Sequence, residues 1–223
     1  MAIIKLVEVS KSYPKSDEVL KKISLTIEER EFVVIRGRSG IGKSTFLRIL
    51  GLLDFPTSGT VLINDHDTSK MNDSKLSDLR LRTNGFVFQQ FNLIPSLTNL
   101  ENIEIPMEIA NIERNERRKR AESLLESFGL SKYAARYPEE ISVGEQQRVA
   151  IARALANNPK VILADEPTAS LDEKNSDAIL DLLKRINEEN KVAVVLTTTS
   201  LTEKYDSTSE LIIEDGNLRE FRG

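Results

Sequence analysis

The sequence predicts an α/β fold with an antiparallel β subdomain on its amino-terminal side and an inserted α-helical subdomain. Three observations predict this class. Short apolar runs, typical of buried strands, recur at residues 32–35, 85–88, 161–164, 192–196 and 211–213. Helical patterns lie between several of these runs, as in parallel strand-helix-strand crossovers. Between about residues 91 and 158, helical periodicity continues without a strand-like run.

The length of the chain favours one domain. Its 223 residues lie below the ~250–300 residues at which single hydrophobic cores stop growing. We therefore expect a single domain over 1–223, in which an α/β core made of 1–90 and 159–223 carries a helical subdomain over about 91–158. Hydrophobic residues at 39% and charged residues at 30% indicate an ordered globular protein.

Cysteine content and net charge argue against several classes of function. The chain has no cysteine, so a disulfide framework and thiolate metal sites are excluded, and a reducing interior compartment is expected. The formal net charge of −4 argues against a general polyanion binder, so no nucleic-acid partner is expected. No run approaches the ~20 apolar residues that span a bilayer, so a membrane role would require a partner.

The amino-terminal elements are predicted from apolar periodicity. Apolar and polar residues alternate from 23 to 27, which indicates a half-buried strand. We expect this strand to pair with an opening strand around residues 6–9. After the central strand at 32–35, a helix is predicted from Ser44. Its apolar residues continue to Leu53 on most sides, so this helix should be buried.

The later elements follow from the same kind of pattern. Between residues 121 and 128, apolar residues fall at i, i+3, i+4 and i+7, which indicates a helix. The preceding charge run at 113–120 is interpreted as a solvated helix face, with a nucleic-acid patch as the minor alternative. Another amphipathic helix is predicted over 179–186. Asp215 and Gly216, between short apolar runs, predict a hairpin turn.

A glycine-rich motif lies between the strand at 32–35 and the following helix. It has the form G-x-x-x-x-G-K-S and comprises Gly37, Arg38, Ser39, Gly40, Ile41, Gly42, Lys43 and Ser44, followed by Thr45. Glycines let the backbone curl so that its N–H groups converge on phosphate oxygens, while the helix points its positive end at the same anion. Lys43 would reach the β- and γ-phosphates, and Ser44 would offer its hydroxyl to Mg²⁺. A chance match in an ordinary turn is the alternative, and the strand-to-helix context argues against it.

Two adjacent carboxylates, Asp165 and Glu166, close the apolar strand at 161–164. Neighbouring strand residues face opposite ways, so Asp165 can lean toward a metal ion while Glu166 faces an attacking water. Taken alone, an acidic pair at a strand end is most simply structural. Its coexistence with the phosphate loop favours a role in phosphate chemistry.

A serine-capped helix precedes this strand. Ser142 is followed three positions later by Glu145, which is the spacing of a capping box, so an exposed helix N-terminus is expected. In a generic sequence this would be only a well-capped helix. The order of the elements favours a functional role instead, because a phosphate loop, a helical lobe, the capped helix and the acidic strand follow one another in the chain.

In this order the motifs resemble those of the nucleotide-binding subunits of ABC (ATP-binding cassette) transporters, from about residue 4 to 216. The segments 88–95 and 97–102 are most similar to the lipoprotein-release and macrolide-export branch. The resemblance implies a P-loop NTPase core of the ABC type that uses ATP and Mg²⁺. It implies a head-to-tail dimer, with an identical or a related second subunit, that encloses two ATP molecules and drives an integral membrane permease. It also implies a cytoplasmic location, peripheral on the inner face of the cell membrane through the permease.

The resemblance further implies how the nucleotide and the metal are held. Tyr13 would stack on adenine, and Lys43 with the loop amides would hold the phosphates. Ser44 and Asp165 would contact Mg²⁺. Gln89 would contact Mg²⁺ or the catalytic water, and it would sense the membrane partner. Without the family pattern, Tyr13 would be only a strand-end residue and Gln89 only a loop residue.

The resemblance also implies roles in catalysis and dimer formation. Glu166 would act as the general base or orient the water. The signature residues, which would reach the other chain's γ-phosphate, are Ser142, Val143, Gly144 and Glu145. Asp172 would link the two sites of the dimer, and its alternative role is a helix cap.

Some positions depart from the family pattern. Thr198 stands where the family normally has a histidine that touches the γ-phosphate, and the only histidine, His66, is predicted to be an exposed turn residue. Val143 replaces the first glycine of the signature, and its β-branched side chain crowds a close backbone approach. Glu145, in place of a common glutamine, is a milder change. We therefore expect ATP binding to survive and hydrolysis to be slow.

Three further functions compete with a transport ATPase. A non-transport member of the superfamily usually has two cassettes in one chain or a long insertion, and neither fits 223 residues. A phosphate-loop kinase would need an acceptor site and a mobile basic lid, and the segment around Ser142 and the loop of Gln89 fit that poorly. An ATP-binding regulatory subunit with little turnover stays open because of Thr198 and Val143.

Overall fold

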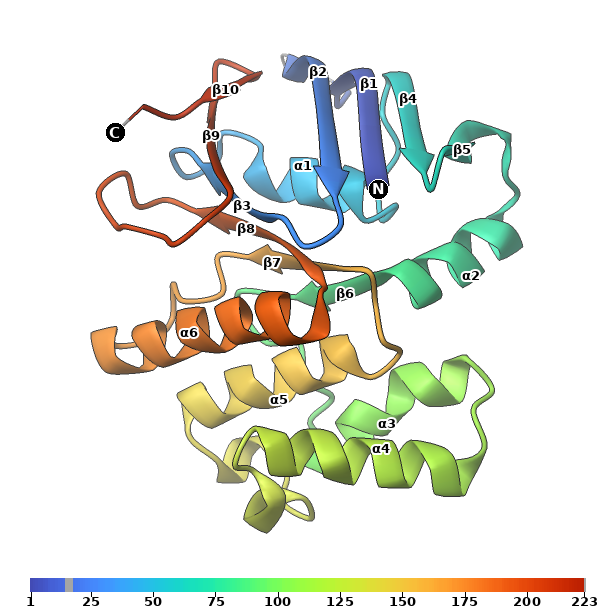
Figure 1. Ribbon diagram of the computed structural model, residues 1–223, viewed down its shortest axis with the longest axis vertical. Helices are drawn as coiled ribbons and strands as arrows, with labels where there is room; N and C mark the ends of the chain where they lie inside the picture. Colours follow the sequence, from blue (N-terminus) through green and yellow to red (C-terminus); the bar gives the residue numbers. More distant parts are fainter. Residues whose placement is uncertain (15–17, 223) are drawn as a thin grey trace.

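The computed structural model describes residues 1–14 and 18–222 and consists of two sheets with flanking helices (Figure 1). The strands are β1 (Ala2–Ser12), β2 (Glu18–Glu28), β3 (Phe32–Arg36), β4 (Ser58–Ile63), β5 (His66–Asp67), β6 (Asn84–Val87), β7 (Val161–Asp165), β8 (Ala193–Thr198), β9 (Ser209–Glu214) and β10 (Asn217–Glu220). The helices are α1 (Lys43–Leu50), α2 (Asp73–Thr83), α3 (Asn99–Ile109), α4 (Arg114–Ser127), α5 (Val143–Leu155) and α6 (Glu173–Asn190), with the 3-10 helices η1 (Thr68–Lys70), η2 (Ser131–Tyr133) and η3 (Pro138–Glu140).

The layers follow the predicted class. One sheet has the strand order β2-β1-β4-β5, and the other has the order β10-β9-β3-β8-β7-β6. In Figure 1, α1 lies between the two sheets, and α6 and α5 lie on the opposite side of the larger sheet, with α3 and α4 beyond them. The predicted α/β fold with an antiparallel sheet and a helical lobe is therefore confirmed.

The larger sheet is parallel across its centre. β3 pairs in parallel with β8 and β9, and β7 pairs in parallel with β6 and β8. Every residue of β3 is buried, as the apolar run at 32–35 predicts for a strand covered on both faces. β9 and β10 form an antiparallel hairpin, and the turn residues Asp215 and Gly216 have φ angles of 48° and 81°. The predicted hairpin turn is confirmed.

The smaller sheet is antiparallel. Leu6 of β1 lies opposite Leu25 of β2, and Val9 lies opposite Ile23, which confirms the predicted pairing. Ile23 and Ile27 are buried, whereas Ser24 and Thr26 between them are exposed, as the period-two pattern requires. β4 and β5 extend this sheet on the other side of β1, and neither strand was predicted.

His66 is exposed, as predicted, but it lies in strand β5 and not in the turn. The turn is made by Asn64 and Asp65, whose φ angles are 47° and 62°. The ring Nδ1 of His66 lies 2.7 Å from the carbonyl oxygen of Asn64. Asn and Asp tolerate the left-handed conformation better than other side chains, and this places the turn before the histidine.

Helix α1 is buried as predicted, but it ends earlier than its apolar pattern suggests. It stops at Leu50 with Gly51 as its C-cap, and Leu52, with a φ of 58°, lies outside it. A Cβ atom at Gly51 would lie 2.1 Å from Cζ of Phe86, so this position requires glycine. Leu52 is buried beyond the helix end, whereas Leu53 is 39% exposed. The expectation of a buried helix that continues to Leu53 is therefore wrong.

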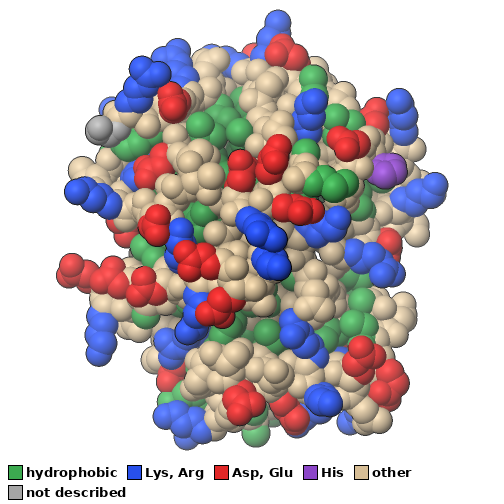
Figure 2. Space-filling model, in the orientation of Figure 1, with side chains coloured by type: hydrophobic (Ala, Val, Ile, Leu, Met, Phe, Trp, Pro, Cys, Tyr) green, Lys and Arg blue, Asp and Glu red, His purple; other side chains and the backbone are tan. Residues whose placement is uncertain are grey.

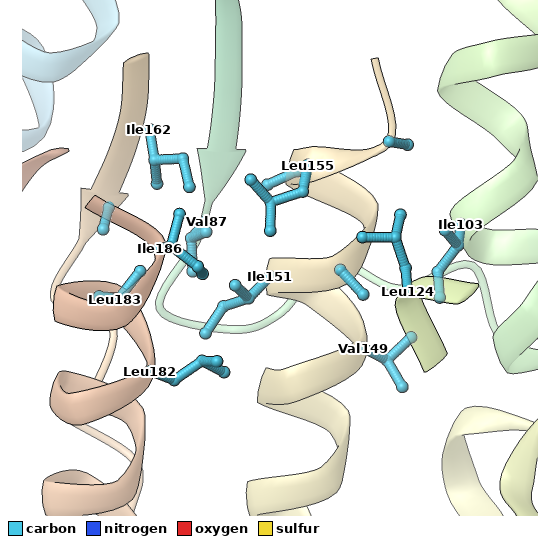
Figure 3. Close-up of a cluster of buried hydrophobic side chains, with 14 of the residues drawn as sticks. Val87, Ile103, Leu124, Val149, Ile151, Leu155, Ile162, Leu182, Leu183 and Ile186 are labelled. Atoms are coloured by element: carbon cyan, nitrogen blue, oxygen red, sulfur yellow. The ribbon is translucent and has the colours of Figure 1, made fainter. Parts of the chain in front are cut away.

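A shared apolar core joins the helical lobe to the larger sheet. Figure 3 shows α5 between α6 on one side and the helices of the lobe on the other, with Ile151 directed to the α6 side and Val149 to the side of Leu124. These side chains belong to one buried cluster that also contains Ile103 of α3 and Ile162 of β7. Helix α5 is therefore packed from both layers.

The charge run at 113–120 forms the first part of α4 as a solvated face. Arg118 lies 3.0 Å from Glu122 on the same helix and 3.8 Å from Glu104 on α3. Figure 2 shows acidic and basic side chains interspersed over the face that it draws. The interpretation of the run as a mixed-charge helix surface is confirmed.

Candidate functional site

The phosphate loop, the acidic pair and Thr198 lie at the carboxyl ends of neighbouring parallel strands. In the pairing of β3 with β8, Arg36 lies opposite Thr198, and in the pairing of β7 with β8, Asp165 lies opposite Thr197. The glycine-rich loop starts directly after Arg36. The loop, the acidic pair and Thr198 therefore lie at one edge of the sheet, which is where open α/β sheets bind ligands.

The backbone of the loop needs its glycines. Gly40 and Gly42 have φ angles of 76° and 112°, which L side chains rarely adopt. A Cβ atom at Gly42 would also lie 2.7 Å from Cγ1 of Val19. Gly42 is the N-cap of α1, and no side chain of the described chain caps this helix. The first N–H groups of α1 are therefore suited to an anion.

The side chain of Lys43 lies inside the curl of the loop. It is only 3% exposed, and its Nζ donates hydrogen bonds to the carbonyl oxygens of Gly37 at 2.8 Å and Arg38 at 3.0 Å. The same Nζ lies 3.0 Å from Oε1 of Glu166. An arriving phosphate group would therefore compete with Glu166 for the ammonium group of Lys43.

A threonine holds the two adjacent carboxylates in place. The hydroxyl of Thr197 donates to Oδ1 of Asp165 at 2.7 Å and accepts a hydrogen bond from the backbone N–H of Glu166 at 3.1 Å. The two carboxylates have different partners, but the strand alternation from which we predicted opposite directions is not the reason. β7 ends at Asp165, and Glu166 has a φ of 45°, so a left-handed turn directs its side chain toward Lys43.

The side chains expected at the metal supply only oxygen donors. Ser44 is exposed in the first turn of α1, Gln89 is exposed just after β6, and Asp165 is partly exposed. A hydroxyl, an amide oxygen and a carboxylate fit Mg²⁺ when phosphate oxygens complete its shell. Among residues 1–14 and 18–222, no group of three or more His, Cys, Asp and Glu side chains could hold a metal ion. The fit therefore depends on oxygens that a nucleotide would bring.

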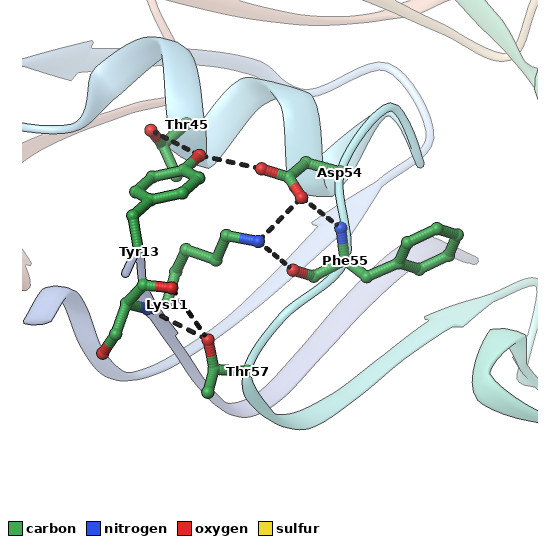
Figure 4. A network of polar contacts seen from close by, with 7 residues as sticks. Lys11, Tyr13, Thr45, Asp54, Phe55 and Thr57 are labelled. Atoms are coloured by element: carbon green, nitrogen blue, oxygen red, sulfur yellow. Dashed lines mark hydrogen bonds and ion pairs between the residues drawn. The ribbon is translucent and has the colours of Figure 1, made fainter. Parts of the chain in front are cut away.

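Tyr13 directly follows β1 and lies beside the phosphate-loop helix (Figure 4). Its hydroxyl donates to Oδ2 of Asp54 at 2.8 Å and lies 3.4 Å from Oγ1 of Thr45 in the first turn of α1. The residue is 38% exposed. The ring is thus placed near the loop by contacts of its hydroxyl group.

The predicted capping box at the N-terminus of α5 is present. Oγ of Ser142 accepts the backbone N–H of Glu145 at 3.4 Å, and the carboxylate of Glu145 accepts the N–H and the hydroxyl of Ser142, each at 2.8 Å. Burial acts to raise the pKa of Glu145, but hydrogen bonds from Tyr133 and Ser142 outweigh it, so that the pKa is lowered. The carboxylate is thus engaged at the N-terminus of its own helix.

The neighbouring signature residues differ in their surroundings. Val143 is already helical and its side chain is 45% exposed, so it causes no backbone strain and acts only through the space that it fills. Gly144 is buried, and a Cβ atom there would lie 2.5 Å from Oδ1 of Asn175. Asp172 caps α6, accepting the backbone N–H of Asn175 at 2.9 Å and its side-chain amide at 2.8 Å. Asn175 therefore connects Asp172 to Gly144.

Arg36 anchors the start of the phosphate loop. It is 2% exposed, and its guanidinium donates to Oε2 of Glu210 at 2.8 Å and to the carbonyl oxygens of Ser200 and Glu203, both at 2.6 Å. The ring of Tyr205 lies 5.1 Å from the guanidinium carbon. Burial and a hydrogen bond to the Glu203 carboxylate raise the pKa of Tyr205 well above its usual value. The loop after β8 is thus tied to the residue that precedes Gly37.

Thr198 occupies the position expected for the missing histidine. It is the last residue of β8 and is 7% exposed. Its hydroxyl accepts the N–H of Ser200 at 3.1 Å. The side chain therefore lies at the sheet edge that carries the phosphate loop. Its hydroxyl, however, is bonded to the loop after β8. His66, on edge strand β5 of the other sheet, does not take its place.

Several residues that shape the site were not predicted. Thr197 orients the acidic pair, and the only signal for it is a polar residue that continues a buried apolar strand. Gln147 is fully buried and donates to the carbonyl oxygen of Pro167 at 2.6 Å, which connects α5 to the segment after the acidic pair. Asp54 binds the Tyr13 hydroxyl across 41 positions of sequence, and no local pattern indicates this contact.

The fold and the site define a phosphate-loop α/β protein with an acidic pair at the end of the adjacent strand. A family model described as "ABC transporter" matches residues 20–169. The chain belongs to the ABC transporter family, as an ATP-binding cassette.

Individual relatives agree with this assignment. An ABC transporter ATP-binding protein of Methanocaldococcus jannaschii, MJ1508, is 47% identical over 98% of each chain. The macrolide export ATP-binding/permease protein MacB of Brucella melitensis is 43% identical over 97% of this chain, which spans 34% of that longer protein. A dimeric structure of the cassette MJ0796 in a post-hydrolysis state, bound to ADP and Pi, superposes with a TM-score of 0.88 at 44% identity and covers 99% of this chain and 100% of that chain. The predicted resemblance to the macrolide-export branch is confirmed.

Proposed function

We propose that this chain binds Mg-ATP and hydrolyses it slowly as one half of a head-to-tail cassette dimer that drives a membrane permease. The observation that carries the proposal is the buried Nζ of Lys43, which lies within the glycine loop and 3.0 Å from Glu166. An ammonium group in this place can bind the terminal phosphate. Glu166, once released from Lys43, then provides a carboxylate beside that phosphate.

Each part of the nucleotide has its own set of residues in this proposal. The loop amides from Gly37 to Thr45 and the ammonium of Lys43 bind the phosphates. Ser44, Gln89 and Asp165 supply oxygens to Mg²⁺, which would neutralise phosphate charge. Tyr13 offers its ring to the adenine. Thr197 keeps the Asp165 carboxylate oriented through the 2.7 Å hydrogen bond.

In the hydrolytic step, Glu166 orients the attacking water and accepts its proton, and Gln89 contacts the same water. Thr198 has no imidazole to place on the γ-phosphate, and its hydroxyl already accepts the N–H of Ser200. One positioned group that stabilises developing charge is worth about a hundredfold to a thousandfold in turnover. Slow intrinsic hydrolysis follows from this loss.

The second half of each site comes from the partner cassette. The exposed N-terminus of α5 presents its signature to the other chain's γ-phosphate through Ser142, Val143, Gly144 and Glu145. Asp172 lies at the N-terminus of α6, joined to Gly144 through Asn175. Asp172 is thus placed to pass the state of one site to the other.

Mg-ATP should convert the purified chain from a single cassette into a dimer, and Lys43→Ala should prevent it. Removing this charge-assisted hydrogen-bond donor should weaken Mg-ATP binding about tenfold to a hundredfold, since such bonds contribute about 1.5–3 kcal/mol. Calorimetry gives the affinity, and light scattering gives the mass with and without Mg-ATP. Lys75→Ala, an exposed change on α2, is the matched control. Unchanged affinity in Lys43→Ala, or no Mg-ATP uptake by the wild type, contradicts the proposal.

A groove between the sheet and the helical lobe supports docking of the permease. It has a volume of about 650 Å³ and is lined by residues of α2, α3, α5 and β6. Its lining includes Ile109, which is 64% exposed, and the buried carbonyl oxygens of the Asn84 and Asn157 side chains, for which no hydrogen bond is found in the described structure. A helical segment with apolar side chains would cover the exposed side chain of Ile109. No helix of the described residues could itself cross a membrane, so the permease would bring the chain to the inner face of the membrane.

Ile109→Asp should release the chain from its permease without affecting ATP binding. A carboxylate in an apolar contact raises the cost of docking, and a loss of tenfold or more in the amount of membrane protein retained is expected. The measurement is co-purification of the permease with the tagged chain from solubilised native membranes. Leu201→Asp, a change of an exposed leucine elsewhere, is the control. Equal retention by both variants would place the permease on another surface.

A regulatory subunit that binds ATP with little turnover is the second candidate, because Thr198 and Val143 affect hydrolysis more than binding. The two candidates differ in one measurement. A regulatory subunit forms the ATP-dependent dimer but releases almost no phosphate, whereas the slow ATPase releases phosphate continuously.

A further inference from the structure

A buried ion pair stands behind the ring of Tyr13. Nζ of Lys11, in β1, lies 2.7 Å from Oδ1 of Asp54 and donates a second hydrogen bond of 2.7 Å to the carbonyl oxygen of Phe55. The other carboxylate oxygen of Asp54 accepts the hydroxyl of Tyr13 at 2.8 Å. Figure 4 shows Lys11 and Asp54 beside the tyrosine, with Asp54 in the segment that follows α1.

The pair is shielded from water and fully engaged. The side chains of Lys11 and Asp54 are 11% and 19% exposed. Burial acts to raise the pKa of Asp54, but hydrogen bonds from Lys11, Tyr13 and the backbone N–H of Phe55 outweigh it, so that the pKa is lowered. Asp54 therefore stays ionised, and its charge holds the lysine on one side and the tyrosine hydroxyl on the other.

The pair fixes the ring in two ways. Asp54 binds the hydroxyl end, and the Nζ of Lys11 lies 4.9 Å from the ring centroid, within the range of a cation–π contact. Oγ1 of Thr45, in the first turn of α1, is 3.4 Å from the hydroxyl oxygen. The ring is therefore held in a fixed orientation relative to α1, the helix whose N-terminus would face the phosphates.

We propose that Asp54 and Lys11 are positioning residues that hold Tyr13 as a preformed stacking face for the base of a purine nucleotide. The inference rests on the proposed function and deepens it, because it separates recognition of the base from recognition of the phosphates. In this inference the ring of Tyr13 stacks on the base, and its hydroxyl serves to position the ring through Asp54.

The size of the effect follows from the ordering of one side chain. A ring that must be immobilised on binding reduces affinity about twofold to tenfold, compared with one that is already held. Tyr13→Phe removes only the hydroxyl contact and keeps both the ring and the Lys11–Asp54 pair. It is the cleanest variant, because Asp54→Asn also leaves a buried lysine without its counter-charge.

The test compares Mg-ATP with inorganic magnesium triphosphate by calorimetry on the full chain. Tyr13→Phe and Asp54→Asn should each weaken Mg-ATP binding about twofold to tenfold and leave triphosphate binding unchanged. Asp54→Asn added to Tyr13→Ala should produce no further loss for Mg-ATP. Asp67→Asn, on the edge strand β5, is the matched control, since among the described residues the carboxylate of Asp67 bonds to its sequence neighbours Ser69 and Lys70.

The outcomes distinguish this inference from the proposed function. If Tyr13→Ala weakens Mg-ATP binding while Tyr13→Phe and Asp54→Asn bind like the wild type, the ring stacks without help and the inference is overturned. An equal loss for Mg-ATP and triphosphate in Asp54→Asn, with a lowered melting temperature, overturns it as well, because it indicates a merely structural pair. If the wild type binds neither ligand, the proposed function itself is wrong.

Discussion

Replacing Glu166 by glutamine should lower Mg-ATP turnover about a hundredfold or more and leave nucleotide binding in place. A positioned general base contributes about 10²–10⁴-fold to such reactions, and a glutamine cannot accept the proton of the attacking water. The change also removes the carboxylate that lies 3.0 Å from Nζ of Lys43. Without this competitor, the ammonium group is available to the γ-phosphate, so the affinity for Mg-ATP should rise and not fall.

Phosphate release under saturating Mg-ATP and calorimetric affinity are the two measurements for Glu166→Gln. Glu173→Gln, in the exposed first turn of α6, is the control for a charge change near the same edge of the molecule. The assignment of Glu166 fails if turnover falls less than tenfold. It also fails if turnover and affinity fall together, because that would make the carboxylate a structural element of the loop.

Placing a histidine at position 198 should raise turnover about tenfold to a hundredfold. A preorganised polar group on the developing charge is worth about 2.7–4 kcal/mol, and an imidazole in a site shaped for threonine should recover part of that. The position is suitable because Thr198 lies opposite Arg36, directly before the phosphate loop. Single-turnover phosphate release, measured at saturating Mg-ATP, reports the chemical step.

Thr199→His is the matched control for Thr198→His. Thr199 is exposed and lies one position beyond the end of β8, so its side chain does not share the buried place of Thr198. Turnover should rise in Thr198→His only. A wild-type rate already within the usual enzyme range of about 1–10³ s⁻¹, unaffected by Thr198→His, would rule out the slow-site hypothesis.

The parts of the fold that depend on local pattern could be predicted from the sequence. The period-two pattern around Ile23 predicted the antiparallel strand, and the run at 32–35 predicted the central strand. The capping box of Ser142 was predicted because its signal spans only four residues. The phosphate loop was predicted because its glycines are required by backbone angles, which Gly42 has in the structure.

The parts that depend on distant contacts could not be predicted. Helix α1 ends with Gly51 as its C-cap, where the ring of Phe86 approaches closely, and the periodicity of apolar residues does not contain this contact. The Lys11–Asp54 pair joins residues 43 positions apart. Thr197 binds Asp165 across 32 positions, because two strands happen to be neighbours in the sheet. Such pairs follow from topology, and topology is not a local property of sequence.

Arg36 has a consequence for how quickly a triphosphate can be captured. Three segments of the carboxyl-terminal part of the chain converge on this one guanidinium: the loop after β8 through Ser200 and Glu203, β9 through Glu210, and the segment after β10 through the ring of Phe221. Arg36 directly precedes the phosphate loop. The conformational entropy of ordering this part of the chain is therefore lost once, during folding, and not again each time a nucleotide binds. Loss of the Arg36 contacts would slow nucleotide binding even if every phosphate-contacting group were intact.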